Sequence, residues 1–221
     1  NFLSYTHPVL SCQEAKVLES RALVDEAAEW AAMKLAGQGI AKHIVQDYYE
    51  LCPPPEYLRI LALIGKGNNG GDALIACGQL LADYPRARLE LILTLPAEEL
   101  RPLAARALQQ LQGRVEVHQI SDQNDVSEIT QMLSDAAGSE GFHICIDGLL
   151  GMAFSPPLCA PVATLIEAVN TFEAIDLRAS VDLPSGKGDG VKNSTISFQA
   201  DFTYATGIAM KPIFEGIAEC G

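Results

Sequence analysis

The chain has 221 residues, of which 48% are hydrophobic and 19% are charged, a composition typical of a globular protein. It carries 28 acidic and 15 basic residues and a net charge of −13, which argues against duplex DNA or an anionic membrane as its main partner. No run of about 18 apolar residues occurs, so no membrane-spanning helix is predicted. Its six cysteines form no C-x-x-C pair, and we expect a reduced, cytoplasmic protein.

The apolar pattern begins with a helical section over about residues 11–52, where apolar side chains recur at helical spacing until Pro53 ends it. Beyond this section, short apolar runs alternate with helical patterns. We expect strands over 58–64, 89–95, 115–120, 142–146, 177–181 and 200–205, and helices over 73–83, 98–112, 126–137 and 158–172. This alternation is typical of βαβ units. The sequence therefore predicts one domain over residues 1–221, a three-layer α/β/α fold with a mostly parallel central sheet.

Ligands bind outside the carboxyl ends of the strands in such a sheet, so the loops after the strands are the candidate sites. Three of these loops combine glycine with polar residues: GKGNNGGD at 65–72, DGLLG at 147–151 and DLPSG at 182–186. Each contains an aspartate, and we expect the three loops to meet at one edge of the sheet. A single aspartate is usually a helix cap or turn former, but the set favours a functional site.

The first loop also fits the G-x-G-x-x-G pattern of dinucleotide-binding folds. Two observations argue against a conventional nicotinamide dehydrogenase. Glu90 lies at the start of its predicted strand, the wrong end for a ribose ligand, and Asp72 is expected to cap the next helix and repel a pyrophosphate. A tight turn without further function is the remaining alternative, although two adjacent asparagines are more than a turn needs.

The aspartates after the fourth and fifth strands, Asp147 and Asp182, would repel each other in a low-dielectric cleft, and one pKa would rise. A monovalent cation held by oxygens of Asn69, Asp147 and Ser185 would relieve this repulsion, since hard cations bind carboxylate, amide and hydroxyl oxygens. Asp182 would then be free to move protons. We therefore expect Asp182 to be the catalytic residue, a general acid and base.

Three segments, GKGNNGGDALIACGQLLAD, IDGLLGMAFSPPL and VDLPSGKGDG, resemble in this order the NAD(P)H-hydrate epimerase family (the YjeF N-terminal domain). The resemblance spans roughly residues 10–212. It implies a Rossmann-like fold and a cytoplasmic isomerase of metabolite repair, which interconverts the R and S forms of hydrated NADH and NADPH. It also implies a potassium cofactor, with Asn69, Asp147 and Ser185 at the potassium positions. The substrate positions it implies are Asn68, Asn69, Gly70, Gly71, Asp72, Gly151, Met152, Ala153, Phe154, Ser155, Pro156, Pro157 and Asp182.

The loop at 151–157 departs from the family pattern Gly-Thr-Gly-Leu-Ser-Arg-Pro, because it lacks the arginine and has Ala153 in place of a glycine. This departure favours an alternative function, a catalytically inactive binding or scaffold module on the same fold. The partners that the resemblance implies are the dinucleotide substrate and an ADP- or ATP-dependent dehydratase, fused or separate. A homodimer is left open as an alternative to a monomer.

Overall fold

The structure is a computed structural model that describes residues 9–191 and 196–215; Cys220 lies outside them. Its centre is a six-stranded sheet with the order β3-β2-β1-β4-β5-β6, and every strand pairing in it is parallel. The strands are β1 (Arg59–Ile64), β2 (Arg88–Leu93), β3 (Glu116–Gln119), β4 (Phe142–Gly148), β5 (Ile175–Val181) and β6 (Phe202–Tyr204). This is the strand order of the Rossmann fold, so the predicted fold class is confirmed.

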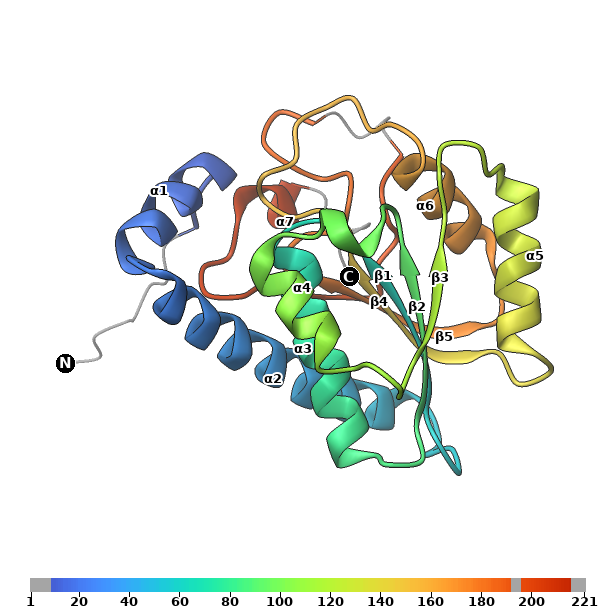
Figure 1. Cartoon of the computed structure of the whole chain (residues 1–221). Helices are drawn as coiled ribbons and strands as arrows, with labels where there is room; N and C mark the ends of the chain where they lie inside the picture. Colours follow the sequence, from blue (N-terminus) through green and yellow to red (C-terminus); the bar gives the residue numbers. More distant parts are fainter. Residues whose placement is uncertain (1–8, 192–195, 216–221) are drawn as a thin grey trace.

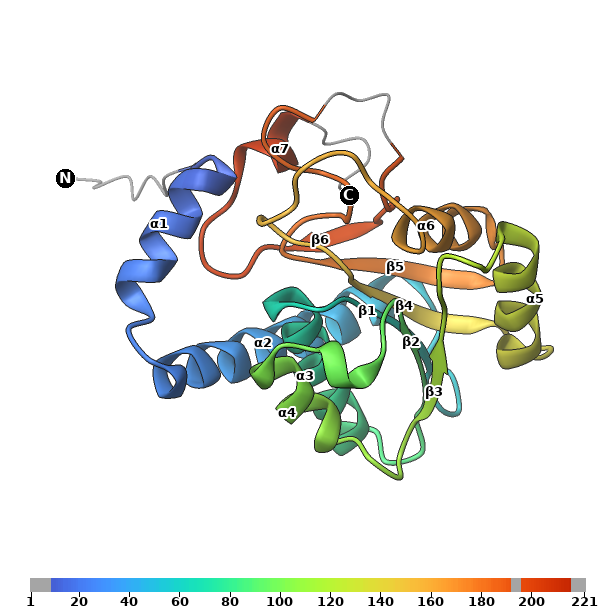
Figure 2. The same ribbon diagram turned by 45° about the horizontal axis from the view of Figure 1, so that its top comes forward.

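Helices cover both faces of the sheet (Figures 1 and 2). They are α1 (Cys12–Ala22), α2 (Glu26–Leu51), α3 (Asn68–Asp83), α4 (Pro102–Gln109), α5 (Val126–Ala137), α6 (Val162–Thr171) and the short α7 (Lys211–Glu215). The buried strand β1 shows how the layers are divided: Ile60, Ala62 and Ile64 pack with α2, α3 and α4. Leu61 and Leu63, on the other face, pack with α5 and α6. Successive side chains of a strand point to opposite faces, so an all-apolar strand indicates a sheet covered on both sides.

Four of the predicted helices have different bounds in the structure, and three of them differ because of caps and prolines. The helical section at 11–52 is two helices, because Asp25 accepts a hydrogen bond from the Ala28 N–H at 2.8 Å and caps α2. The helix predicted at 98–112 is a 3-10 turn (Ala97–Glu99) followed by α4, which begins at Pro102. The helix predicted at 158–172 begins only at Val162, after Pro161 at its N-cap.

The start of α3 corrects a prediction that bears on the site. The helix begins at Asn68 and not at 73, and its N-cap is Gly67. Asp72 therefore lies in the second turn of α3 and does not cap it, contrary to our expectation. Glu90 lies in the first half of β2, away from the ligand-binding edge, as predicted. Its carboxylate contacts His118 at 2.8 Å.

The first and last described segments lie side by side. Leu10 and Met210 form an isolated parallel bridge, with the Leu10 N–H donating to the Ala209 carbonyl at 3.2 Å. The Asp189 carboxylate, from the loop after β5, accepts hydrogen bonds from the Cys12 and Gln13 N–H groups at 3.0 and 3.1 Å. Helix α1 is thereby held beside the C-terminal part of the chain (Figure 2).

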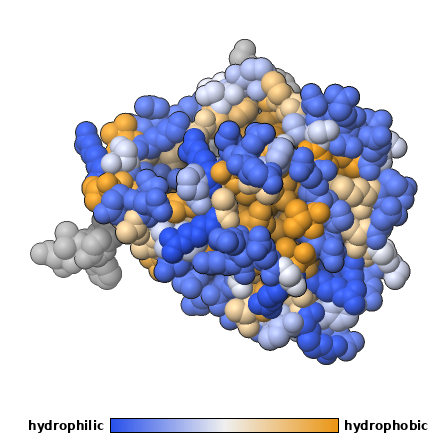
Figure 3. All heavy atoms as spheres, viewed as in Figure 1, coloured by the Kyte–Doolittle hydropathy of each residue, from blue (hydrophilic) through white to orange (hydrophobic). Residues whose placement is uncertain are grey.

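The surface agrees with the composition. Figure 3 shows a face that is mostly hydrophilic, with apolar side chains gathered near its middle. The five cysteines among the described residues form no disulfide. Within the same residues, no helix has both the length and the apolar character that a membrane crossing requires.

Candidate active site

The loops that follow β1, β4 and β5 meet at one edge of the sheet because these three strands are neighbours. The Gly65 N–H donates to the Gly148 carbonyl at 3.2 Å. A Cβ at Gly65 would lie 1.8 Å from the Leu149 carbonyl oxygen, so only glycine permits this approach of the first loop to the second. The structure therefore brings together residues that are more than eighty positions apart in the chain.

Asp147, at the end of β4, lies at the centre of this junction and has no exposed surface. Its carboxylate accepts hydrogen bonds from the Ser185 hydroxyl at 2.6 Å, the Ser185 N–H at 2.8 Å and the Ser180 hydroxyl at 3.3 Å. The Leu149 N–H donates a further bond at 3.2 Å. Burial raises the pKa of Asp147 to about 6, although these neutral donors lower it in part.

Asn69 joins the same cluster through the second loop. Its side-chain amide donates to the Leu150 carbonyl at 2.8 Å, and the Leu150 N–H donates to the Ser185 hydroxyl oxygen at 2.9 Å. The Asn69 amide oxygen faces Gly151, where an added Cβ would lie 3.2 Å from it. The predicted cation set of Asn69, Asp147 and Ser185 is therefore clustered in space around Leu150.

The chemistry of this donor set fits a monovalent cation. It offers a carboxylate, an amide oxygen, a hydroxyl and the Leu150 carbonyl, which are all hard oxygen ligands. The carboxylate is fully buried, and a buried negative charge is costly without a positive partner. In the described residues, no group of three or more His, Cys, Asp or Glu side chains could hold a metal, so the cluster is unlike a zinc centre.

Asp182, the first residue after β5, is held in an unusual backbone conformation. Its φ is 66°, and it is the only described residue other than glycine with a positive φ. Side chains other than Asn and Asp rarely adopt this region, and such strain often marks functional sites. The Asp182 side chain is 5% exposed and accepts a hydrogen bond from the Thr206 hydroxyl at 3.3 Å.

The Asp182 carboxylate lines a cavity of about 400 Å³, called here the central cavity. Eight of the predicted substrate residues line it: Asn68, Asn69, Asp72, Gly151, Met152, Ala153, Phe154 and Asp182. The other five do not line it: Gly70, Gly71, Ser155, Pro156 and Pro157. The last three of these are exposed.

Gly70 and Gly71 have a packing role in the structure. A Cβ at Gly70 would lie 2.2 Å from the Gly65 carbonyl oxygen, and one at Gly71 would lie 2.5 Å from the Met33 side chain. Both glycines are inside α3, where the residue type is otherwise unfavourable. They let the first turn of α3 pack against β1 and α2, which places Asn68 and Asn69 at the cavity.

Sequence reasoning missed several residues of the central cavity. Glu19 and Lys16 come from α1, and Thr206 follows β6. Lys66 precedes α3, and Arg101 is the N-cap of α4. Lys66 could have been found, since it lies inside the first motif. The others had no local signal, because their approach depends on how α1 and the segment after β6 pack.

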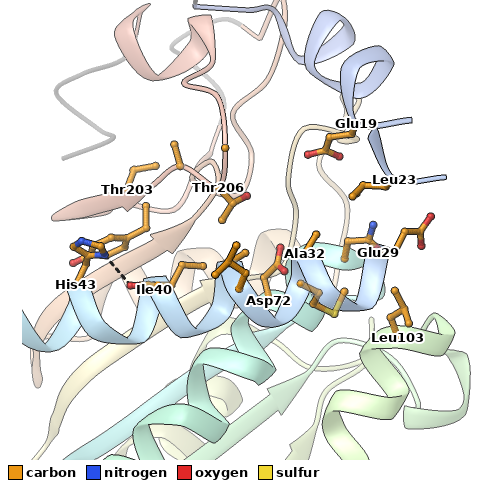
Figure 4. Close-up of a pocket in the computed structure, with 18 residues that line it drawn as sticks. Glu19, Leu23, Glu29, Ala32, Ile40, His43, Asp72, Leu103, Thr203 and Thr206 are labelled. Carbon is orange, nitrogen blue, oxygen red and sulfur yellow. Dashed lines mark hydrogen bonds between the residues drawn. The ribbon is translucent and has the colours of Figure 1, made fainter. Parts of the chain in front are cut away.

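Two further hollows adjoin the central cavity and share residues with it. One, of about 610 Å³, lies between α2 and the segment after β6 and includes Glu19, Asn68, Asp72 and Thr206. Figure 4 shows Glu19, Asp72 and Thr206 approaching this space from different elements. The other, of about 220 Å³, includes Glu19, Asp182 and Thr206. The three hollows therefore adjoin one another, and Glu19 and Thr206 line all three; together they are called the cleft here.

Three carboxyl groups of this cleft are close enough to affect one another. Burial, followed by the charge of Glu19, raises the pKa of Asp182 to about 6. Hydrogen bonds from Thr206 and from the Met152 N–H act in the opposite direction. Burial, followed by the charges of Asp182 and Glu19, raises the pKa of Asp72 well above its usual value. A carboxyl group with a pKa near 6 can both donate and accept a proton near neutral pH.

Comparison with known proteins agrees with this arrangement. A family model described as "YjeF-related protein N-terminus" matches residues 30–212. The NAD(P)H-hydrate epimerase of Rhodopirellula baltica is 31% identical over 200 residues, which are 89% of this chain and 73% of that protein. The bifunctional NAD(P)H-hydrate repair enzyme Nnr of Gloeobacter violaceus is 28% identical over 193 residues. This second match covers 85% of the chain but only 33% of the relative.

A solved structure supports the fold in the same way. The crystal structure of the yeast protein ynu0 aligns with a TM-score of 0.72 and 20% identity, over 91% of this chain and 81% of that one. At this identity the likeness concerns the fold. The family match, by contrast, covers most of the chain and all three loops of the site. The chain belongs to the YjeF N-terminal family.

Proposed function

We propose that the protein is an NAD(P)H-hydrate epimerase, which interconverts the R and S forms of hydrated NADH and NADPH. The observation that carries this proposal is the position of Asp182, a buried carboxyl group with a pKa near 6 on the wall of the central cavity. The names of the related enzymes support the same activity. The intact cluster of Asn69, Asp147 and Ser185 disfavours the scaffold alternative, because a scaffold has no need of it.

The reaction needs a group that can donate and recover one proton. The substrate carries a hydroxyl on the ring carbon beside the ring nitrogen. Protonated Asp182 donates its proton to this hydroxyl, the C–O bond breaks and water leaves. The nitrogen lone pair stabilises the resulting ring cation. Water then adds to either face, and Asp182 takes back the proton.

The neighbours of Asp182 suit this role. The Thr206 hydroxyl orients the carboxylate at 3.3 Å, and the rigid turn after β5 fixes its backbone. Only 5% of Asp182 is exposed to solvent, and this low exposure strengthens its electrostatic effect on the reacting carbon. Asn69, Asp147 and Ser185 would hold potassium, which would supply a fixed positive charge to the loop junction and stabilise the buried Asp147 carboxylate.

An Asp182→Asn variant tests the proposal. The assay supplies the R-hydrate together with an S-specific dehydratase and measures the recovery of NADH. We expect the variant to lose at least about a hundredfold in rate while its circular dichroism spectrum stays unchanged. Asp135→Asn, on the exposed side of α5, is the matched control and should keep full activity.

The possible results separate the alternatives. Full activity of Asp182→Asn would reject Asp182 as the acid and base. A wild-type protein that binds the hydrate but does not epimerise it would favour the scaffold function. We also propose that the S-hydrate passes to a dehydratase, either as a fused domain or as a separate protein, in keeping with the bifunctional relative.

A further inference from the structure

The central cavity is also lined by three basic residues, of which only Lys66 lies in a sequence motif. Lys66 and Arg101 are adjacent, since the Arg101 N–H donates to the Lys66 carbonyl at 3.0 Å. Lys16, on α1, completes the group, and all three residues line the cavity. Their side chains are exposed. Within residues 9–191 and 196–215, none of the three side chains takes part in an ion pair or a side-chain hydrogen bond.

The basic and acidic groups of the cavity differ in their surroundings. Glu19, Asp72 and Asp182 each also line one or both of the adjoining hollows. Lys66 and Arg101 line the central cavity but neither of those hollows. The carboxyl groups therefore border the neighbouring hollows, whereas Lys66 and Arg101 face the central cavity alone. A ligand that fits both sets of groups carries an anionic group at some distance from its reacting group.

The start of α3 lies next to Lys66. Its N-cap, Gly67, gives no side-chain hydrogen bond to the helix, and the first turn contains no acidic residue. A Cβ at Gly67 would meet nothing within 4 Å, so the space in front of the helix is open. The N–H groups at the start of a 16-residue helix favour negative charge. In a chain with a net charge of −13, this local concentration of positive charge is a marked exception.

We propose that Lys66 and Arg101, assisted by Lys16, bind the pyrophosphate of a dinucleotide whose reacting ring lies at Asp182. The identity of the ligand rests on the proposed function, whereas the anion site rests on the residues just described. Arginine binds phosphate through two parallel N–H donors, and lysine adds a point charge. The three side chains therefore set where the substrate is held, and Asp182 acts at the other end.

Binding of ADP-ribose tests this site, because ADP-ribose carries the pyrophosphate but no nicotinamide. Isothermal titration compares the wild type with the Lys66→Ala/Arg101→Ala double variant. We expect affinity to fall ten- to a hundredfold and the wild-type affinity to weaken as salt is added. Lys34→Ala/Lys42→Ala, on exposed positions of α2, removes the same charge elsewhere and should bind within twofold of the wild type. Lys66→Arg should retain most of the affinity.

Kinetics with hydrated NADH give a second measurement. The double variant should raise KM by a larger factor than it lowers kcat, since the lost contacts are far from the reacting carbon. Equal ADP-ribose affinity in the double variant and the wild type would overturn the proposal, as would a wild type that does not bind ADP-ribose. Lys66- and Arg101-dependent binding without epimerisation would support the anion site and reject the epimerase function. Epimerisation at the wild-type rate and KM in the double variant would support the epimerase function and reject the anion site.

Discussion

We expect the buried Asp147 to make the stability of this protein depend on pH and, through the proposed cation site, on potassium. The perturbation is Asp147→Asn, which removes the ionisable group and keeps its size. Burial raises the Asp147 pKa from 3.8 to about 6, and two pKa units correspond to about 3 kcal/mol. Because Asp147 has no exposed surface, this value needs no large reduction for solvent screening.

The sign follows from the direction of the pKa shift. The folded protein binds the Asp147 proton more tightly than the unfolded chain does. The stabilisation is therefore complete below about pH 4 and is lost as the pH rises through about 6. In potassium-free buffer, the free energy of unfolding should fall by about 3 kcal/mol more in the wild type than in Asp147→Asn between these limits.

Potassium should reverse this loss, because the proposed cation site would hold it against the ionised Asp147 carboxylate. At pH 8 and at about 100 times its dissociation constant, potassium should add about 2.7 kcal/mol to the wild type. Potassium should add little to the free energy of unfolding of the wild type at pH 4. It should add little to that of Asp147→Asn at any pH. Urea unfolding followed by circular dichroism, in potassium or tetramethylammonium chloride of equal ionic strength, measures both effects. Equal pH slopes in the two proteins would refute the burial argument, and equal stability in both salts at pH 8 would refute the cation site.

Three further changes have outcomes that the structure specifies. Thr206→Val removes a hydrogen bond that lowers the pKa of Asp182, so the alkaline limb of the pH–rate profile, where the catalytic proton of Asp182 is lost, should move to higher pH. Glu19→Gln removes a charge that raises the same pKa, so the limb should move to lower pH; shifts in the same direction in both variants would contradict this electrostatic account. Gly70→Ala would place a methyl group 2.2 Å from a backbone carbonyl oxygen. Thermal unfolding should show that the free energy of unfolding falls by about 2 kcal/mol or more. Gly67→Ala is the control, because its methyl group would meet nothing within 4 Å, and it should keep wild-type stability.

The sequence predicted the features that follow from the alternation of strands and helices. The parallel sheet, the meeting of the three loops at one edge and the proximity of Asn69, Asp147 and Ser185 follow from the alternation of elements and from the rule that ligands bind at the carboxyl ends of strands. The start of α3 was mispredicted because glycines indicate turns, whereas Gly70 here permits a close backbone contact inside a helix. Nothing local in the sequence connects Glu19 with Asp182, because their meeting depends on the packing of α1.

The bridge between Leu10 and Met210 joins the first described segment to the last, and this contact should affect how the two segments unfold locally. Helix α1 and the segment after β6 each supply part of the cleft, and neither can leave without breaking the bridge or the Asp189 contact. Their amide hydrogens should therefore exchange with solvent as one cooperative unit. A ligand bound between them should slow amide hydrogen exchange at residues 10–23 and 205–211 together. Binding in the cleft can therefore be detected near both ends of the described chain.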